Sequence, residues 1–157
     1  MRIQTFTEIQ LREIANLLAG AVTHKVLTSV FRDCGLNERG TVENGNPKWQ
    51  RIVITLDDRQ GRDGCGNNVG ALIQAVMNPV RFVGQQGQFS DLRQRLNEIL
   101  AFMGLSVGED GNLREAQQAR TLSEAAERGP QGSGDYHPRR HPGRAACDGC
   151  RRGEGVF

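Results

Sequence analysis

The sequence predicts a mainly α-helical fold, a compact bundle of about five helices with one small β-hairpin, followed by a disordered tail. Three observations lead to this prediction. Apolar residues recur at helical spacing, capping residues precede these stretches, and the composition changes abruptly near residue 128. With 157 residues, of which 37% are apolar, the chain fits one globular domain with additional polar segments.

Two helices are predicted near the N-terminus. A capping box starts the first at Thr7, and apolar residues then follow at helical spacing as far as Ala21. Thr23 can cap a second helix, which Gly35 stops because glycine suits the position after a helix end. Residues 36–46 are polar and glycine-rich, and we therefore expect a loop there.

A third helix is predicted to follow this loop. Asn46 supplies a capping side chain, and Pro47 stands where the first helical residue would be. Trp49 is the first of the apolar residues on one face, and the helix runs to about Gly61. The glycine-rich stretch 61–66 is predicted to be a turn.

The next two helices carry the strongest periodic patterns. Either Asn67 or Asn68 is expected to cap the fourth helix, and Pro79 ends it. Ser90 is expected to cap the following helix, over residues 90–103, which has the clearest apolar repeat.

A hairpin and a short helix complete the body of the chain. Extended runs at 105–107 and 112–114 flank the Asp110-Gly111 pair, and such a pair between extended runs is typical of a hairpin turn. Thr121 begins another capping box, so a last helix is predicted to start there.

The domain is predicted to end near residue 128. Residues 129–157 contain seven Gly and three Pro but no Leu, Ile or Met, so they cannot bury enough apolar surface to order themselves. They also hold five Arg and three acidic residues, which leaves the body, residues 1–128, with 15 basic and 15 acidic residues. We expect this tail to be disordered and to be the product of a frameshift or a truncation.

The sequence predicts a cytoplasmic protein without a membrane partner. No run approaches the length of about 18 apolar residues that a membrane-spanning helix needs. The first residues, Met1 to Thr5, lack the apolar core of a signal peptide.

Four tail residues have the spacing of a zinc site: His137, His141, Cys147 and Cys150. Two imidazoles and two thiolates suit tetrahedral zinc, but almost no apolar residue lies between the pairs for a metal to organise. We therefore predict no metal and no cofactor, with these four residues as weak candidates. Nor does the sequence unite a nucleophile, a base and an orienting group, so no catalytic residue is assigned.

The helix–helix–hairpin order over residues 67–114 is typical of a winged helix, with 90–103 in the recognition position. Its polar face would present side chains suited to base edges and phosphates. These candidate nucleic-acid contacts are Arg93, Gln94 and Asn97, with Arg114, Lys48, Arg51 and Arg81 as further phosphate contacts. The neutral body argues against this function, because affinity for nucleic acid depends heavily on phosphate neutralisation.

Five runs of the body stand out together: Pro47 to Arg51, Asn67-Asn68, Met77 to Phe82, Phe89 to Leu105, and Glu109-Asp110-Gly111. In this combination they resemble a module found in bacterial proteins of the Ymh type. Similar modules precede the effector domain of several abortive-infection proteins of the AbiJ kind. The likeness covers roughly residues 6–128.

This resemblance implies a non-catalytic sensing or regulatory module, placed before a HEPN-like C-terminal domain in the complete architecture. The chain departs from that pattern at Arg128, where the C-terminal domain would follow. The Arg-x4-6-His motif of RNA-cutting HEPN domains is not carried over, because Arg128 lies too far from His137 and Arg140 too near His141. The implied partner is another protein, or the effector domain in full-length relatives. Alternatives are a nucleic-acid-binding winged helix and a zinc-binding tail.

Overall fold

The computed structural model describes residues 1–38 and 45–127, and this part of the chain is mainly helical with one two-stranded antiparallel sheet, as predicted. The order of elements also follows the prediction. The elements are α1 (Glu8–Ala21), α2 (His24–Asp33), α3 (Lys48–Asp63), α4 (Asn67–Val76), η1 (Pro79–Phe82, a 3-10 turn), α5 (Gln86–Leu100), η2 (Ala101–Met103, a 3-10 turn), β1 (Leu105–Val107), β2 (Leu113–Glu115) and α6 (Leu122–Glu127).

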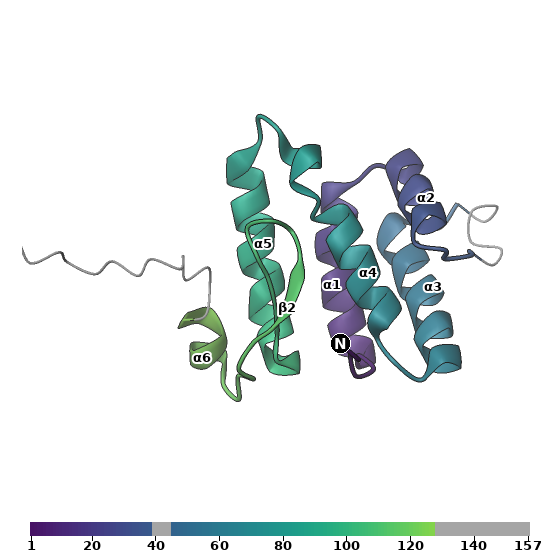
Figure 1. Cartoon of the computed structure of the whole chain (residues 1–157). Helices are drawn as coiled ribbons and strands as arrows, with labels where there is room; N and C mark the ends of the chain where they lie inside the picture. Colours follow the sequence, from purple (N-terminus) through teal and green to yellow (C-terminus); the bar gives the residue numbers. More distant parts are fainter. Residues whose placement is uncertain (39–44, 128–157) are drawn as a thin grey trace, which may run out of the picture.

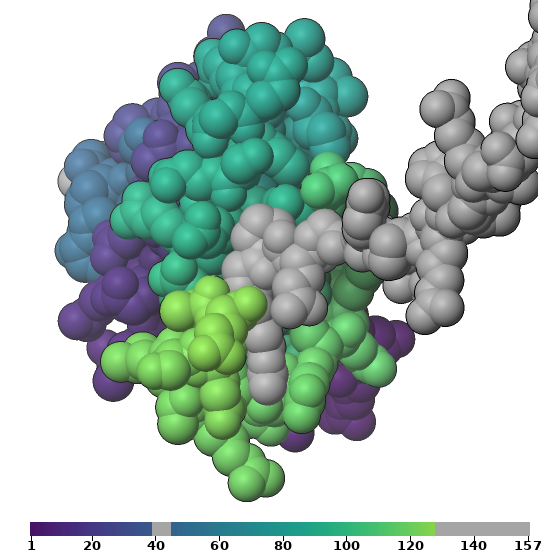
Figure 2. Space-filling model, turned by 90° about the vertical axis from the view of Figure 1, so that its left-hand side faces the viewer, coloured from purple at the N-terminus to yellow at the C-terminus, as the bar shows by residue number. Residues whose placement is uncertain are grey.

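Helix α1 is central, because it packs against α3 and α4 as well as against α5 (Figure 1). Leu11, Ile14 and Leu18 of α1 are at most 1% exposed and lie at helical spacing, so they share the face that enters the core. The hairpin lies over α5 through β1 and over α4 through β2. The remaining short helix, α6, packs against α5. Figure 2 shows α6, in yellow-green, in the lower half of the molecule.

No single helix in residues 1–38 and 45–127 has both the length and the apolar character needed to cross a membrane. Helices α1 and α2 together have that length and composition, but they meet at an angle of 118°.

The capping residues predicted for the first two helices are confirmed. Thr7 and Gln10 exchange side-chain bonds with each other's backbone N–H, which completes the capping box. The Thr23 hydroxyl accepts from the N–H of Val26 at the start of α2. Gly35 follows the end of α2 with φ 65°, the left-handed conformation that favours glycine.

The predicted bounds of α3 are wrong at both ends. Asn46 does not cap the helix; Pro47 is the capping residue, and α3 begins one residue later. The helix also continues past Gly61 to Asp63, so only the end of the stretch 61–66 is a turn. Gly64 stops α3 with φ 63°, and its N–H bonds back into the last turn of the helix.

The predicted asparagine cap of α4 is also wrong, because both amides are used elsewhere. Gly66 is the residue that precedes α4. The side-chain oxygen of Asn67, Oδ1, accepts from the backbone N–H of Ile3 at 2.8 Å. The Asn68 amide donates to a carboxylate of Asp63. Asn67 thereby fixes the segment before α1 instead of capping its own helix.

Helix α5 begins at Gln86, four residues before the predicted cap at Ser90. Phe89 lies in this additional turn, and its ring meets the ring of Phe82 edge to face, with the centroids 5.3 Å apart. An aromatic pair of this geometry stabilises by about 0.5–1.5 kcal/mol beyond the burial of its area. A contact with η1 therefore supports a helical turn for which the local sequence has no capping signal.

Both outer edges of the hairpin are bonded by side-chain amides. The Asn97 amide of α5 accepts from the N–H of Val107 at 2.6 Å and donates to its carbonyl at 3.1 Å. On the other side, the Gln74 carbonyl oxygen accepts from the N–H of Leu113 at 2.9 Å. The helices thus continue the hydrogen bonding of the two-stranded sheet.

Candidate functional site

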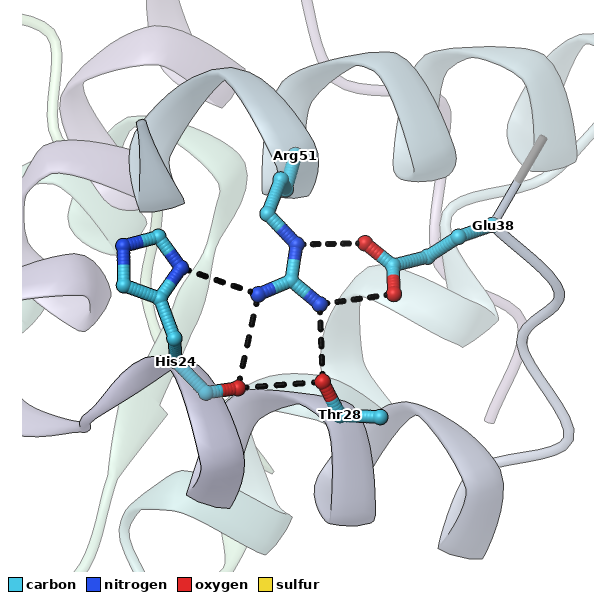
Figure 3. Close-up of polar contacts among 4 residues, drawn as sticks. All are labelled: His24, Thr28, Glu38 and Arg51. Atoms are coloured by element: carbon cyan, nitrogen blue, oxygen red, sulfur yellow. Dashed lines mark hydrogen bonds and ion pairs between the residues drawn. The ribbon is translucent and has the colours of Figure 1, made fainter. Parts of the chain in front are cut away.

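Arg51 lies in the first turn of α3 and is 3% exposed. Its guanidinium meets the carboxylate of Glu38 with two parallel bonds, Nε to Oε1 and Nη2 to Oε2, each 2.7 Å long (Figure 3). This paired geometry matches the planar guanidinium to the planar carboxylate. The prediction that Arg51 contacts phosphate is therefore wrong, because the side chain is turned inward and already paired.

The other Arg51 donors are bonded to α2. Nη1 lies 3.1 Å from Nδ1 of His24, and Nη2 donates to the Thr28 hydroxyl at 2.9 Å. Because a guanidinium only donates, Nδ1 of His24 is the acceptor in this contact. The Thr28 hydroxyl in turn donates to the carbonyl of His24 at 3.0 Å. Arg51 thus joins the start of α3, the start of α2 and the segment that follows α2.

Lys48, the first residue of α3, also bonds within the fold. Its ammonium donates to the carbonyl oxygen of Val22 at 2.6 Å, and Val22 is the residue that ends α1. A cation at this position is favourable because the carbonyls at a helix C-terminus carry partial negative charge. This bond uses one of the three ammonium donors of a partly buried side chain, so a phosphate contact of Lys48 stays a prediction.

The predicted reading face of α5 is covered by the hairpin. Arg93 is 7% exposed and Asn97 is 4% exposed, whereas Gln94 beside them is exposed. Since β1 packs on the side of α5 that carries Asn97, the expectation of a solvent-exposed polar face is wrong for Arg93 and Asn97. Gln94 alone of the three points away from the body.

Arg93 differs from Arg51 in having almost no polar partner. Its Nε is sealed from solvent and unpaired, and within residues 1–38 and 45–127 the guanidinium makes no hydrogen bond. The nearest carboxylate is that of Glu109 in the hairpin turn, whose Oε1 lies 3.7 Å from Nη2 of Arg93. This distance gives an ion pair but exceeds that of a hydrogen bond.

The two remaining candidates, Arg81 and Arg114, are exposed. Nε of Arg81 donates to the carbonyl of Ala75 at 3.0 Å, and Nη2 of Arg114 donates to Asp110 at 2.7 Å. Hydrogen bonds from the side chain and backbone of Asn112, with a smaller effect of the Arg114 charge, hold the pKa of Asp110 below its ordinary value. Both arginines therefore retain solvent access while bonding within the fold.

Two apolar side chains project around η1, and we call Val80 and Val83 the η1 tip. They are 77% and 80% exposed, although Phe82 between them is buried. Figure 1 places this segment at the upper end of the molecule, where the chain passes from α4 to α5, and Figure 2 shows the same end far from α6. The sequence pattern did not predict this feature, because Pro79 indicates only the end of a helix. Other exposed large apolar residues are Met1, Ile9, Ile54 and Leu122.

The thiols and possible metal ligands add no further cluster. Burial, and then the neighbouring Asp33 charge, raise the pKa of the Cys34 thiol, which keeps it protonated at neutral pH. In the part of the chain that the structure describes, no three His, Cys, Asp or Glu side chains are grouped to hold a metal ion. The predicted disordered tail and its weak zinc candidates lie outside the described residues; these are His137, His141, Cys147 and Cys150.

Comparison of the chain with protein families, with curated proteins and with solved structures found no match. The features of the fold that bear on function are therefore the placement of Arg51, Lys48 and Arg93 and the exposed η1 tip.

Proposed function

We propose that this chain is a non-catalytic regulatory module of the cytoplasm that acts by contacting a protein, as its resemblance to the N-terminal modules of AbiJ-like phage-defence proteins implies. The observation that carries the proposal is the inward placement of cationic side chains. Arg51 and Lys48 bond to groups within the fold, and Arg93 is buried beside Glu109 of the hairpin turn.

This placement buries, or bonds within the fold, three of the five cationic side chains proposed for a nucleic-acid surface. Binding to nucleic acid requires arginine and lysine side chains that neutralise phosphates at the surface. Of the other four candidates, Asn97 is buried and bonds to the hairpin, and Gln94, Arg81 and Arg114 are exposed. Residues 1–128 also carry no net charge.

The η1 tip supports contact with a protein. Two valines with about four-fifths of their surface exposed lie on either side of a buried phenylalanine. Exposed apolar side chains that lie close together on a surface mark sites of contact with other proteins. The proposed partner is a separate protein or the effector domain of a full-length relative.

A plating experiment tests this function. A bacterial host expressing a full-length AbiJ-type defence protein is challenged with phage, with and without this chain. The chain is expected to raise plating efficiency, because an isolated regulatory module competes for the trigger or the effector contact. The double variant Val80→Asp, Val83→Asp should lose this effect, whereas Ile9→Asp, a matched exposed change on α1, should keep it. Equal plating with and without the chain would contradict the regulatory function.

A binding experiment distinguishes this function from nucleic-acid binding. The same chain is titrated with mixed-sequence duplex DNA and RNA over a series of salt concentrations. We expect residues 1–128 to make no contribution to binding. The variant Arg81→Ala, Arg114→Ala should therefore have the same affinity for DNA and RNA as the parent. A steep loss of affinity with salt that disappears in this variant would instead establish a nucleic-acid-binding module.

A further inference from the structure

Arg93 is a buried cation without adequate partners. Its side chain is 8% exposed, its Nε has no partner, and its only charged neighbour among the described residues is Glu109, at 3.7 Å. Removing a guanidinium from water is unfavourable unless its N–H groups find acceptors. A guanidinium in this position therefore favours an acceptor that comes closer than Glu109 does.

Arg51 shows how this chain satisfies a buried arginine. Its Nε and Nη2 both bond to one carboxylate at 2.7 Å, and that carboxylate is itself largely buried, with 9% of the Glu38 side chain exposed. Glu109, in contrast, is 79% exposed and reaches Arg93 with one oxygen at 3.7 Å. The two sites have the same chemical groups, but only one of them is closed.

The hairpin turn that carries Glu109 is itself well fixed. Asp110, the next residue, accepts from Asn112 at 3.1 Å and from Arg114 at 2.7 Å. The N–H of Gly111 donates to the carbonyl of Gly108 at 3.0 Å. The loose contact with Arg93 therefore belongs to the Glu109 side chain and not to a mobile turn, so this side chain can leave without moving the hairpin.

We infer that Arg93 is an oxyanion-binding site, and that the Glu109 carboxylate is a weak internal substitute which a carboxylate or phosphate group displaces. The incoming group accepts from Nη2 of Arg93, which is the atom that Glu109 faces. This inference is independent of the regulatory function, because it concerns only what Arg93 binds.

The burial of Arg93 restricts what can enter. A duplex backbone needs an open cationic surface, whereas here Arg93 is buried. Asn97, one turn further along α5, is bonded to β1. A small free oxyanion or the end of an acidic side chain is narrow enough to replace the Glu109 carboxylate. Both sources offer the same acceptor oxygens.

Nuclear magnetic resonance of the full chain tests the site through the Arg93 Nε–Hε signal. The probes are inorganic phosphate and a hexaglutamate peptide, each titrated at constant ionic strength with sodium chloride as the control. In the parent chain, the Arg93 signal is expected to shift as a probe is added and to reach a plateau when the site is saturated. In Glu109→Gln, a change at an exposed residue, the affinity should increase about fivefold, because the competing carboxylate is gone. Arg95→Gln, the matched change of an exposed arginine on α5, should leave the affinity unchanged.

The outcomes separate the sources of the anion. Saturation by phosphate supports a free anion as the ligand, and saturation by hexaglutamate alone supports an acidic protein segment. Binding that persists unchanged in Arg93→Met would overturn the inference. So would an Arg93 signal that neither probe shifts in the parent or in Glu109→Gln, a test that stands even where Arg93→Met does not fold.

Discussion

Glu38→Gln is expected to lower the free energy of unfolding by about 3–5 kcal/mol, because it leaves the Arg51 guanidinium buried without its counter-charge. Arg51 is 3% exposed and makes its two shortest bonds to Glu38, so water cannot replace the missing carboxylate. Urea unfolding of the full chain measures the effect. Trp49 lies two residues before Arg51 on α3 and provides a fluorescence signal close to the change.

Two control variants isolate the buried pair. Arg12→Gln breaks the exposed pair between Arg12 and Glu8, and its cost should stay within about 0.5 kcal/mol. The double variant Glu38→Leu, Arg51→Met removes both charges, and we expect it to be more stable than Glu38→Gln alone. A loss in Glu38→Gln no larger than that in Arg12→Gln would show that water reaches Arg51.

Gly111→Ala is expected to cost about 2–5 kcal/mol, which combines backbone strain with a collision in a packed region. Gly111 has φ 76°, and a Cβ atom there would meet the carbonyl oxygen of Met77 and lie 3.1 Å from Cδ of Pro79. Neither the carbonyl nor the proline ring is a flexible side-chain end, so the hairpin turn has to move away from the end of α4. Thermal or urea unfolding of the variant measures the loss.

Gly84→Ala is the matched control for this substitution. Gly84 has φ 80°, but a Cβ atom there would have no neighbour within 4 Å. Only the backbone term of about 1–2 kcal/mol then applies. The difference between the two variants measures the contact between the hairpin turn and α4. An equal loss of unfolding free energy in the two variants would mean that the hairpin turn moves away from α4 without a measurable cost.

The sequence predicts best where the determining residues are neighbours in the chain. Thr7 and Thr23 cap their helices through bonds to residues three positions later, and a window of that length contains both partners. The start of α5 could not be found in this way, because Phe89 depends on Phe82 beyond an intervening turn. The local sequence pattern thus predicts that a helix forms here, whereas a contact with a residue outside the helix determines where it begins.

The candidate site was predicted poorly because burial depends on partners elsewhere in the chain. Glu38 precedes Arg51 by 13 residues, and no periodic pattern relates them. For Arg93 a signal was present: it shares the i, i+3, i+4, i+7 positions of one helix face with the buried residues Leu96, Asn97 and Leu100. This spacing predicts a buried position, whereas the charge of Arg93 favours an exposed one.

The amide bonds at the hairpin edges have a consequence for self-association. A two-stranded sheet ordinarily offers free backbone groups along both edges, and a strand of another molecule can add there. Here the Asn97 amide already occupies both backbone groups of Val107, and Gln74 occupies the N–H of Leu113. An incoming strand would first have to break these bonds, so the two helices protect the hairpin against edge-to-edge aggregation.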